Sequence, residues 1–134
     1  MLIEKYFTEI ETRIADSIYV QKSKLIIDKR SSYIGFIDGE IDFIDGSKLY
    51  FIEFVETKEV VNLYKYSYHY QNKKGEMIFW YDMAPHHKEL SSFPHHKHIM
   101  EEGGLLKTLE SRISRFSDVL DEIEEMISLS RNMK

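Results

Sequence analysis

The sequence has 134 residues, of which 43% are hydrophobic and 31% are charged. This length is typical of one domain, and 9 Tyr, 8 Phe and 1 Trp supply bulky side chains for a core, so the composition excludes a disordered chain. The absence of cysteine excludes disulfides and Cys-ligated metal sites. The sequence also lacks a signal peptide and any apolar run near the roughly 20 residues that span a membrane. We therefore expect a single cytoplasmic domain over residues 1–134, with no membrane partner.

The net charge of −5 argues against an electrostatic clamp on nucleic acid formed by the whole protein. Residues 62–98 differ from the rest, because they contain five Lys or Arg residues against three Asp or Glu residues and all six histidines. A polyanion such as RNA is expected to bind to this segment.

The chain begins with a predicted amphipathic helix over residues 1–17, in which apolar residues recur every three or four positions. Residues 24–82 follow as runs of β-branched and aromatic residues separated by short turn sequences such as Asp45-Gly46-Ser47. They predict an antiparallel meander of four to five strands. Asp38-Gly39 marks either a bulge within one long strand or a separate hairpin turn.

Residues 83–104 are predicted to form a histidine-rich loop, because Pro85 and Pro94 cannot continue a central strand or a helix interior. A long C-terminal helix is predicted over residues 105–131 from an apolar stripe that starts at Leu105 and Leu109. The stripe either packs on the sheet or forms a homodimer with a second copy. The fold class predicted from these elements is α+β.

Five histidines fall within 13 residues, and a Pro-His-His unit occurs twice. Imidazole can both accept and donate a proton near neutral pH. Cleavage of RNA by its own 2′-hydroxyl needs a base, an acid and cations near the phosphate. Two imidazoles can supply base and acid without a metal or other cofactor, and Lys88 and Lys97 can contact phosphate. The candidate acids and bases are His86, His87, His95, His96 and His98.

Two other interpretations of these histidines remain open. His96 and His98 would point the same way in an extended segment, and with His86 and Asp82 they could hold zinc or another divalent metal. Alternatively, the histidines belong to a polar loop that hydrogen-bonds its own backbone.

Aromatic residues alternate along residues 61–70 and in the strand that follows. Four tyrosines share one face of the first strand and His69 lies on the other. The tyrosine face is either a stacking platform for unpaired bases or part of the core. The candidate substrate contacts are His69, Tyr66, Tyr68 and Trp80, together with Lys88 and Lys97.

Two carboxylates complete the candidate site. Asp82 ends a strand directly before the histidine-rich segment, where it could orient an imidazole or bind a cation. Glu53 interrupts an apolar strand, and a buried carboxylate there needs a partner. It is either paired with Lys65 or a tyrosine hydroxyl, or it is a base with a raised pKa near the histidines.

Three stretches of the sequence, read as one string, resemble the TumE-type toxin family of prokaryotic toxin–antitoxin operons. These stretches are Tyr66-Ser-Tyr-His69-Tyr-Gln, Gly75-Glu-Met-Ile-Phe-Trp80-Tyr-Asp82-Met-Ala-Pro-His86-His87 and Phe93-Pro-His95-His96-Lys-His98. The resemblance covers roughly residues 33–98. It implies a small cytoplasmic toxin that acts on RNA and is held in check by an antitoxin encoded beside it.

This chain differs from relatives of that family at two positions, where it has Trp80 in place of Arg and Met83 in place of Asn. A guanidinium is a natural phosphate clamp, whereas an indole can only stack. The leading hypothesis is a metal-independent ribonuclease toxin. The alternatives are a non-catalytic, dimeric interaction or nucleic-acid-binding module and a His/Asp metal-dependent hydrolase.

Overall fold

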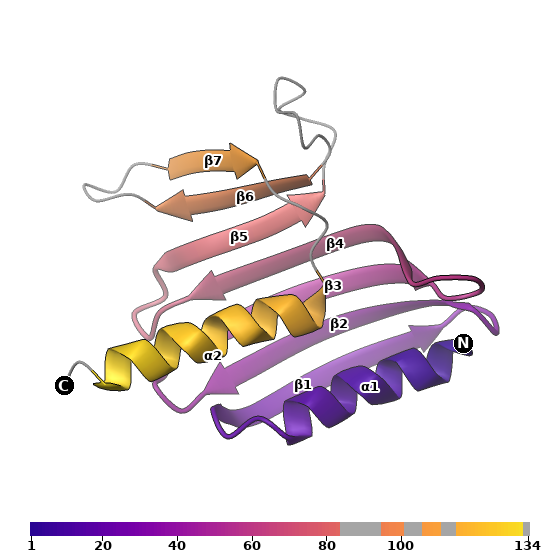
Figure 1. Cartoon of the computed structure of the whole chain (residues 1–134), viewed down its shortest axis with the longest axis horizontal. Helices are drawn as coiled ribbons and strands as arrows, with labels where there is room; N and C mark the ends of the chain where they lie inside the picture. The colour runs from indigo at the N-terminus through magenta and orange to yellow at the C-terminus, as the bar shows by residue number, and fades with distance from the viewer. Residues whose placement is uncertain (84–94, 101–105, 111–114, 133–134) are drawn as a thin grey trace.

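The computed structural model describes residues 1–83, 95–100, 106–110 and 115–132, and it shows two helices on one antiparallel sheet (Figure 1). The described strands form a seven-stranded sheet in the sequential order β1-β2-β3-β4-β5-β6-β7. The α+β fold class is confirmed, although the predicted four to five strands are too few. The elements are α1 (Ile3–Ala15), β1 (Val20–Lys29), β2 (Ile34–Phe43), β3 (Lys48–Glu56), β4 (Asn62–Gln71), β5 (Met77–Met83), β6 (His95–Met100), β7 (Leu106–Glu110) and α2 (Phe116–Asn132).

The largest departure from the predicted elements lies between residues 95 and 110. β6 occupies part of the predicted loop 83–104, β7 occupies the start of the predicted helix 105–131, and α2 begins only at Phe116. Pro94 directly precedes β6, a position at which proline is compatible with a strand. The leucine spacing misled the prediction, because short apolar runs fit a helix and a strand equally well. β1 also begins at Val20 rather than at residue 24.

Both helices bury their apolar stripes against the same face of the sheet (Figure 1). Each large apolar side chain buried in this way stabilises the fold by about 1.5–3 kcal/mol relative to leaving it exposed. The stripe of α2 is therefore used within the chain and does not require a second copy. The buried stripe residues are Ile3, Tyr6, Phe7, Ile10 and Ile14 of α1 and Phe116, Val119, Leu120, Ile123 and Ile127 of α2. Neither described helix is long and apolar enough to cross a membrane.

The strand register divides the sheet into two faces. We call the face under the helices the helix face, and it contains the row Ile37, Glu53 and Tyr66. The opposite face, over which no described helix lies, we call the open face. One row crosses the open face through Lys24, Glu40, Tyr50, His69, Trp80, His98 and Thr108.

β2 runs without interruption through Asp38-Gly39, so this dipeptide forms neither of the two predicted irregularities. The reason for the glycine is its neighbour Phe51 on β3. A Cβ atom at position 39 would lie 2.1 Å from Cε1 of the Phe51 ring. The ring packs directly on the backbone at this point, which leaves no room for a side chain.

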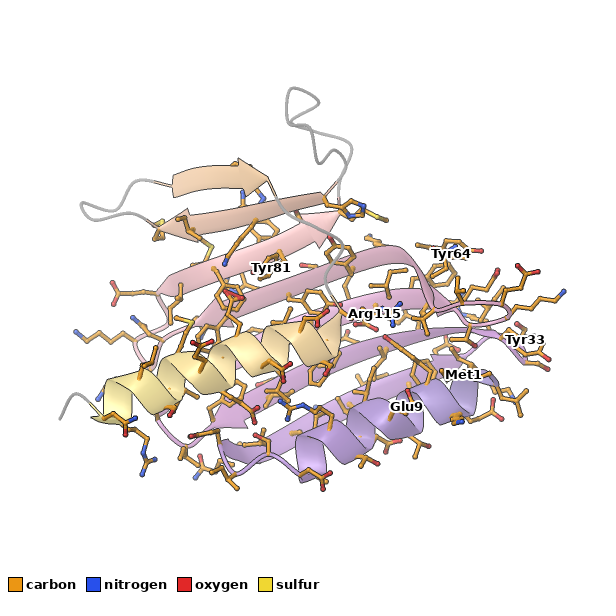
Figure 2. The ribbon with its side chains drawn as sticks, viewed as in Figure 1. Met1, Glu9, Tyr33, Tyr64, Tyr81 and Arg115 are labelled. Atoms are coloured by element: carbon orange, nitrogen blue, oxygen red, sulfur yellow. The ribbon has the colours of Figure 1, made fainter. Side chains whose placement is uncertain are left out.

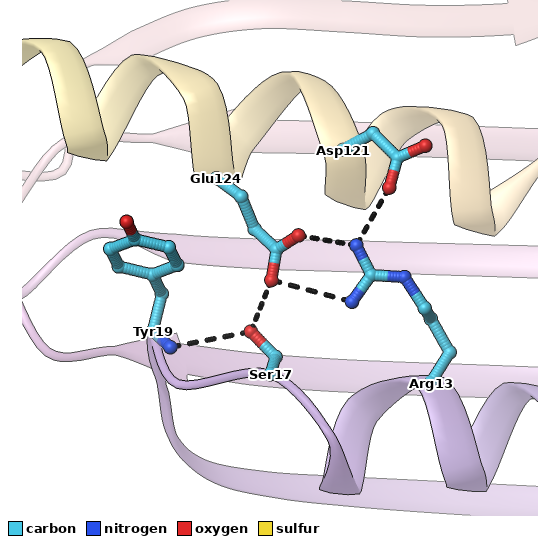
Figure 3. Close-up of polar contacts among 5 residues, drawn as sticks. All are labelled: Arg13, Ser17, Tyr19, Asp121 and Glu124. Carbon is cyan, nitrogen blue, oxygen red and sulfur yellow. Dashed lines mark hydrogen bonds and ion pairs between the residues drawn. The ribbon is translucent and has the colours of Figure 1, made fainter.

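A polar network joins the two helices beside the core (Figure 3). The Arg13 guanidinium of α1 donates to Asp121 at 2.7 Å and also to Glu124 of α2. Glu124 accepts a further hydrogen bond from the Ser17 hydroxyl at 2.5 Å. Burial opposes ionisation of Glu124, but the hydrogen bonds from Arg13 and Ser17 outweigh it and lower the pKa of this carboxyl. The network therefore favours the charged form of Glu124.

Candidate functional site

Glu53 lies on the helix face and is completely buried. Its Oε1 accepts a hydrogen bond from the Tyr6 hydroxyl. Its Oε2 accepts one from the Tyr68 hydroxyl at 2.5 Å and one from the Phe116 N–H at 3.0 Å. Burial raises the pKa of Glu53, and these hydrogen bonds oppose the rise without cancelling it. Tyrosine hydroxyls are thus the partners of Glu53, while Lys65 belongs to the open face.

Three of the four tyrosines of β4 are core residues and do not form an exposed platform. Tyr66, Tyr68 and Tyr70 are each at most 2% exposed. A register shift at Phe54/Val55 removes Tyr64 from their face, and its hydroxyl donates to Glu56 at 2.5 Å. In this conformation Tyr66 and Tyr68 cannot stack on a base as predicted, because neighbouring rings and the helices already cover them.

On the open face, Asp82 and His98 form a buried pair, with exposed fractions of 7% and 5%. Nε2 of His98 lies 3.3 Å from Oδ1 of Asp82, and Nδ1 lies 3.0 Å from the Thr108 hydroxyl. A carboxylate can only accept, so we assign the ring proton to Nε2. The Nδ1 lone pair then accepts from Thr108. The three residues therefore form a chain of donors and acceptors typical of groups that move protons.

Aromatic rings continue from this pair across the open face. The Trp80 ring centroid lies 5.1 Å from that of His98 and 6.0 Å from that of His69. The Trp80 indole N–H donates to the Ser67 hydroxyl at 2.9 Å, which fixes the ring. Burial lowers the pKa of His69, which favours the neutral form of this imidazole.

His95 and Lys97 lie on the helix face, opposite His98. Nδ1 of His95 lies 3.0 Å from the Tyr66 hydroxyl, and the two rings are stacked with centroids 5.8 Å apart. Lys97 donates to Glu122 of α2 at 2.7 Å, next to Tyr81 (Figure 2). The described imidazoles are consequently divided between the two faces instead of gathering in one cleft.

The remaining predicted residues lie outside the part of the chain that the structure describes. These are His86, His87, Lys88 and the side chain of His96. The backbone of His96 is described, and it pairs with Asp82 across β5 and β6.

Among the described residues, no group of three His, Asp or Glu side chains could hold a metal ion. Of the four alternative metal ligands, Asp82 and His98 are described, and they are hydrogen-bonded to each other.

Two of the hollows in the described part of the structure bear on the candidate site. One of about 280 Å³ lies between the helices and is lined by residues that include Glu9 of α1 and Arg115 before α2 (Figure 2). The other has a volume of about 150 Å³ and lies beside His69 on the open face. The residues that line the second hollow are Asp38, Tyr50, Phe51, Ile52, Ser67 and His69.

Sequence reasoning missed Thr108, Asp38 and Tyr50. Thr108 was assigned to a helix, which hid its pairing with His98. Asp38 and Tyr50 are ordinary surface residues in the sequence, and only the register of β2, β3 and β4 brings them beside His69.

Comparison with known proteins gives one match. The family model described as Toxin TumE matches residues 10–129, which is most of the chain and includes both faces of the sheet. None of the curated proteins and none of the solved structures that were compared matches the chain.

Proposed function

The chain belongs to the TumE toxin family, and from this premise we propose that it is a metal-independent endoribonuclease whose proton-transfer centre is the Asp82–His98 pair. A member of this family is the toxin of a toxin–antitoxin system, so a cognate antitoxin is its partner. The ribonuclease chemistry is our inference from the residues on the open face.

The observation that carries the proposal is the short chain from Asp82 through His98 to Thr108. A carboxylate on one ring nitrogen fixes the tautomer and stabilises the imidazolium when the other nitrogen takes a proton. We propose that a substrate hydroxyl takes the position that the Thr108 hydroxyl occupies next to Nδ1. His98 therefore suits the role of general base better than the other described histidines.

In the proposed reaction, the ribose 2′-hydroxyl takes the place of Thr108 at Nδ1 of His98 and gives its proton to that atom. The 2′-oxygen attacks the adjacent phosphorus, and the bond to the 5′-oxygen breaks. This gives a 2′,3′-cyclic phosphate and a new 5′-hydroxyl, with the proton for the leaving oxygen supplied by an acid. We propose that His86, His87 or His96 is that acid.

Phosphate contacts come from the open face. Lys97, one of the two predicted contacts, is held by Glu122 on the helix face. Lys65 is exposed on β4, two residues before Ser67 and on the same face of the sheet. It has no ion pair with any other described residue. We propose that Lys65, together with Lys88, contacts the RNA backbone, while Trp80 stacks on a base.

The test compares His98→Gln with His95→Gln, since both histidines lie on β6 but on opposite faces. Loss of a general base lowers the rate by about 10²–10⁴-fold. We expect this loss of RNA cleavage in His98→Gln, and only a small change in His95→Gln, whose ring lies on the helix face against Tyr66. Circular dichroism checks that both variants are folded.

Asp82→Asn extends the test, because an amide can no longer stabilise the imidazolium, and we expect slower cleavage with a changed pH profile. Cleavage should persist in EDTA. Unchanged cleavage in His98→Gln would refute the proposed centre, and loss of cleavage on chelation would favour the metal-dependent alternative. RNA binding without any cleavage by the wild type would favour a binding module, a role that the Trp80 substitution for arginine also suits.

A further inference from the structure

The hollow beside His69 contains two polar side chains that are not hydrogen-bonded to any other described side chain. Asp38 is exposed and makes no hydrogen bond or ion pair within the described ranges, and the His69 ring makes no hydrogen bond to another side chain there. Other open-face carboxylates are occupied, since Glu40 and Asp42 both bind Lys48. A carboxylate and an imidazole that line the same concave surface are typical of a site that recognises a polar ligand.

The shape of the hollow suits a flat ring. Its volume of about 150 Å³ is of the order of one nucleobase. Ile52 of β3 forms an apolar floor between Asp38 and Ser67, its register partners on either side. Tyr50, which is 40% exposed, pairs with His69 at one end. The Lys48 ammonium lies over its ring, 5.5 Å from the centroid, so a base would stack on the opposite ring face. An aromatic base can therefore lie between an apolar floor and a tyrosine ring.

The hydrogen-bonding groups select among the four bases. A carboxylate accepts two parallel hydrogen bonds, which requires two adjacent donors on the ligand. Guanine has such a pair in its N1–H and 2-amino groups, and its O6 can accept from the imidazole N–H of His69. Adenine and cytosine place a ring acceptor next to their amino group, and uracil places its single N–H between two carbonyls. Each of these three bases would place a hydrogen-bond acceptor next to the Asp38 carboxylate, which is itself an acceptor, so the two would repel each other.

The hollow is also suitably placed relative to the proposed reaction centre. His69 on β4 and His98 on β6 belong to one row and are two strands apart, which is about 10 Å at the usual strand spacing of about 4.8 Å. Trp80 lies between them, and its ring is near both. A short single-stranded RNA can thus occupy the hollow and reach His98.

We propose that this hollow is a guanine-binding subsite, in which Asp38 reads the Watson–Crick edge of an unpaired guanine and His69 and Tyr50 hold its ring. This inference rests on the proposed function, because it assigns a base preference to the same RNA-binding surface. It makes Asp38 a specificity-determining residue that takes no part in the chemistry.

The test measures binding of 2′-O-methyl RNA pentamers by fluorescence anisotropy, because these probes lack the 2′-hydroxyl nucleophile and cannot be cleaved. Four probes carry G, A, C or U in the centre of an otherwise identical sequence. A bidentate contact with a base gives roughly tenfold discrimination or more. We expect the G probe to bind at least about tenfold more tightly than the other three.

Asp38→Asn should reduce this preference to about twofold or less, because one of the two acceptors becomes a donor. The matched control is Glu40→Gln, which removes the same charge from the same strand but does not line the hollow, and it should keep the full preference. Equal binding of all four probes, a preference for another base, or a G preference that survives Asp38→Asn would each overturn the inference.

Cleavage of RNA, measured separately, distinguishes the two proposals. If the wild type prefers the G probe but does not cleave RNA, the subsite proposal stands and the ribonuclease proposal fails. If the wild type cleaves RNA but binds the four probes equally, the ribonuclease proposal stands and the subsite proposal fails.

Discussion

The two faces of the sheet differ in how their polar side chains are satisfied. On the helix face, the Glu53 carboxylate receives three hydrogen bonds and is completely buried. On the open face, Asp38 and His69 line a hollow and have no side-chain hydrogen-bond partner within the described ranges. The comparison teaches that a carboxylate inside an apolar strand need not be catalytic. Its surroundings, and not its unusual place in the sequence, indicate whether it serves stability or binding.

The surroundings of Asp82 and His98 combine features of Glu53 on the helix face and of Asp38 on the open face. The two residues are buried like Glu53, but they lie on the open face, and His98 is also hydrogen-bonded to the Thr108 hydroxyl. This combination of a fixed tautomer and an open-face position is the reason why we place the chemistry here. The substitutions below test the structural roles assigned to the two faces and to the helices.

The largest effect on stability is expected from Glu53→Leu, which removes the carboxylate that accepts from the buried donors of Tyr6, Tyr68 and Phe116. Each unsatisfied buried group costs about 1–3 kcal/mol, so we expect a loss of about 3 kcal/mol or more in the free energy of unfolding. Urea denaturation measures it. Tyr68→Phe removes one of the three hydrogen bonds and should cost about 1 kcal/mol. A smaller loss in Glu53→Leu than in Tyr68→Phe would contradict the structural role of Glu53.

The raised pKa of Glu53 also predicts a pH dependence. A carboxyl whose pKa is raised on folding stabilises the fold most at low pH, below its unfolded value near 4.5, and this contribution disappears as the pH rises through the folded value. The stability of the wild type relative to Glu53→Gln should therefore decrease as the pH rises above about 4.5 and then become constant. A difference that increases over this range would show that Glu53 is preferentially ionised in the folded protein.

A second substitution, Gly39→Ala, tests the close packing of Phe51 on β2. The new methyl group would overlap the ring, and such overpacking costs about 1–3 kcal/mol. Thermal or urea denaturation provides the measurement. The cost should be smaller in a Phe51→Leu background, since the ring is then absent. An equal cost in both backgrounds would mean that the glycine is needed for another reason.

A smaller effect is expected from Arg13→Gln, which breaks the network between the helices (Figure 3). Partly exposed ion pairs contribute about 0.2–1 kcal/mol and weaken with salt. Because the pKa of Glu124 is lowered, its contribution is present above about 4.5 and disappears as the pH falls through the folded value. The difference between wild type and variant should therefore decrease in acid and at high salt. Arg30→Gln, which breaks the exposed Arg30–Asp28 pair, is the control with a near-zero effect.

The smallest effects on stability are expected on the open face, from Tyr50→Thr and His69→Gln. Exposed or half-exposed side chains outside the core usually change stability by less than about 0.5 kcal/mol. Both variants should nevertheless weaken binding of the G-containing probe described above. A loss of stability comparable to that of Gly39→Ala would show that these residues hold the sheet together, and the distinction between the faces would fail.

Much of the fold follows from local sequence patterns. The spacing of apolar residues in α1 identified a helix whose predicted inward positions are all buried, because periodicity directly reports which side of a helix faces the core. The alternating strands up to Asp82 were found for the same reason. β7 was missed because its identity depends on pairing with β6, a partner that the local pattern of leucines does not reveal.

The candidate site was predictable only in part. The position of Asp82 at a strand end beside the histidines correctly suggested that it contacts an imidazole. Which imidazole it contacts depends on the register of β5 and β6, and adjacent histidines on a strand point to opposite faces. His95 was therefore placed in the same pool as His98, although the sheet separates them. Thr108 and Asp38 could not be found, because long-range pairing alone brings them to their partners.

The sequential order of the strands has a consequence for synthesis on the ribosome. Each strand pairs with the one just before it, so hairpins can form one after another as the nascent chain emerges. Of the described elements, α2 emerges after the others, and it covers Phe51 and supplies the third donor to the Glu53 carboxylate. Until then the apolar side of the nascent sheet is only half covered, and chaperones have an interval in which to bind it.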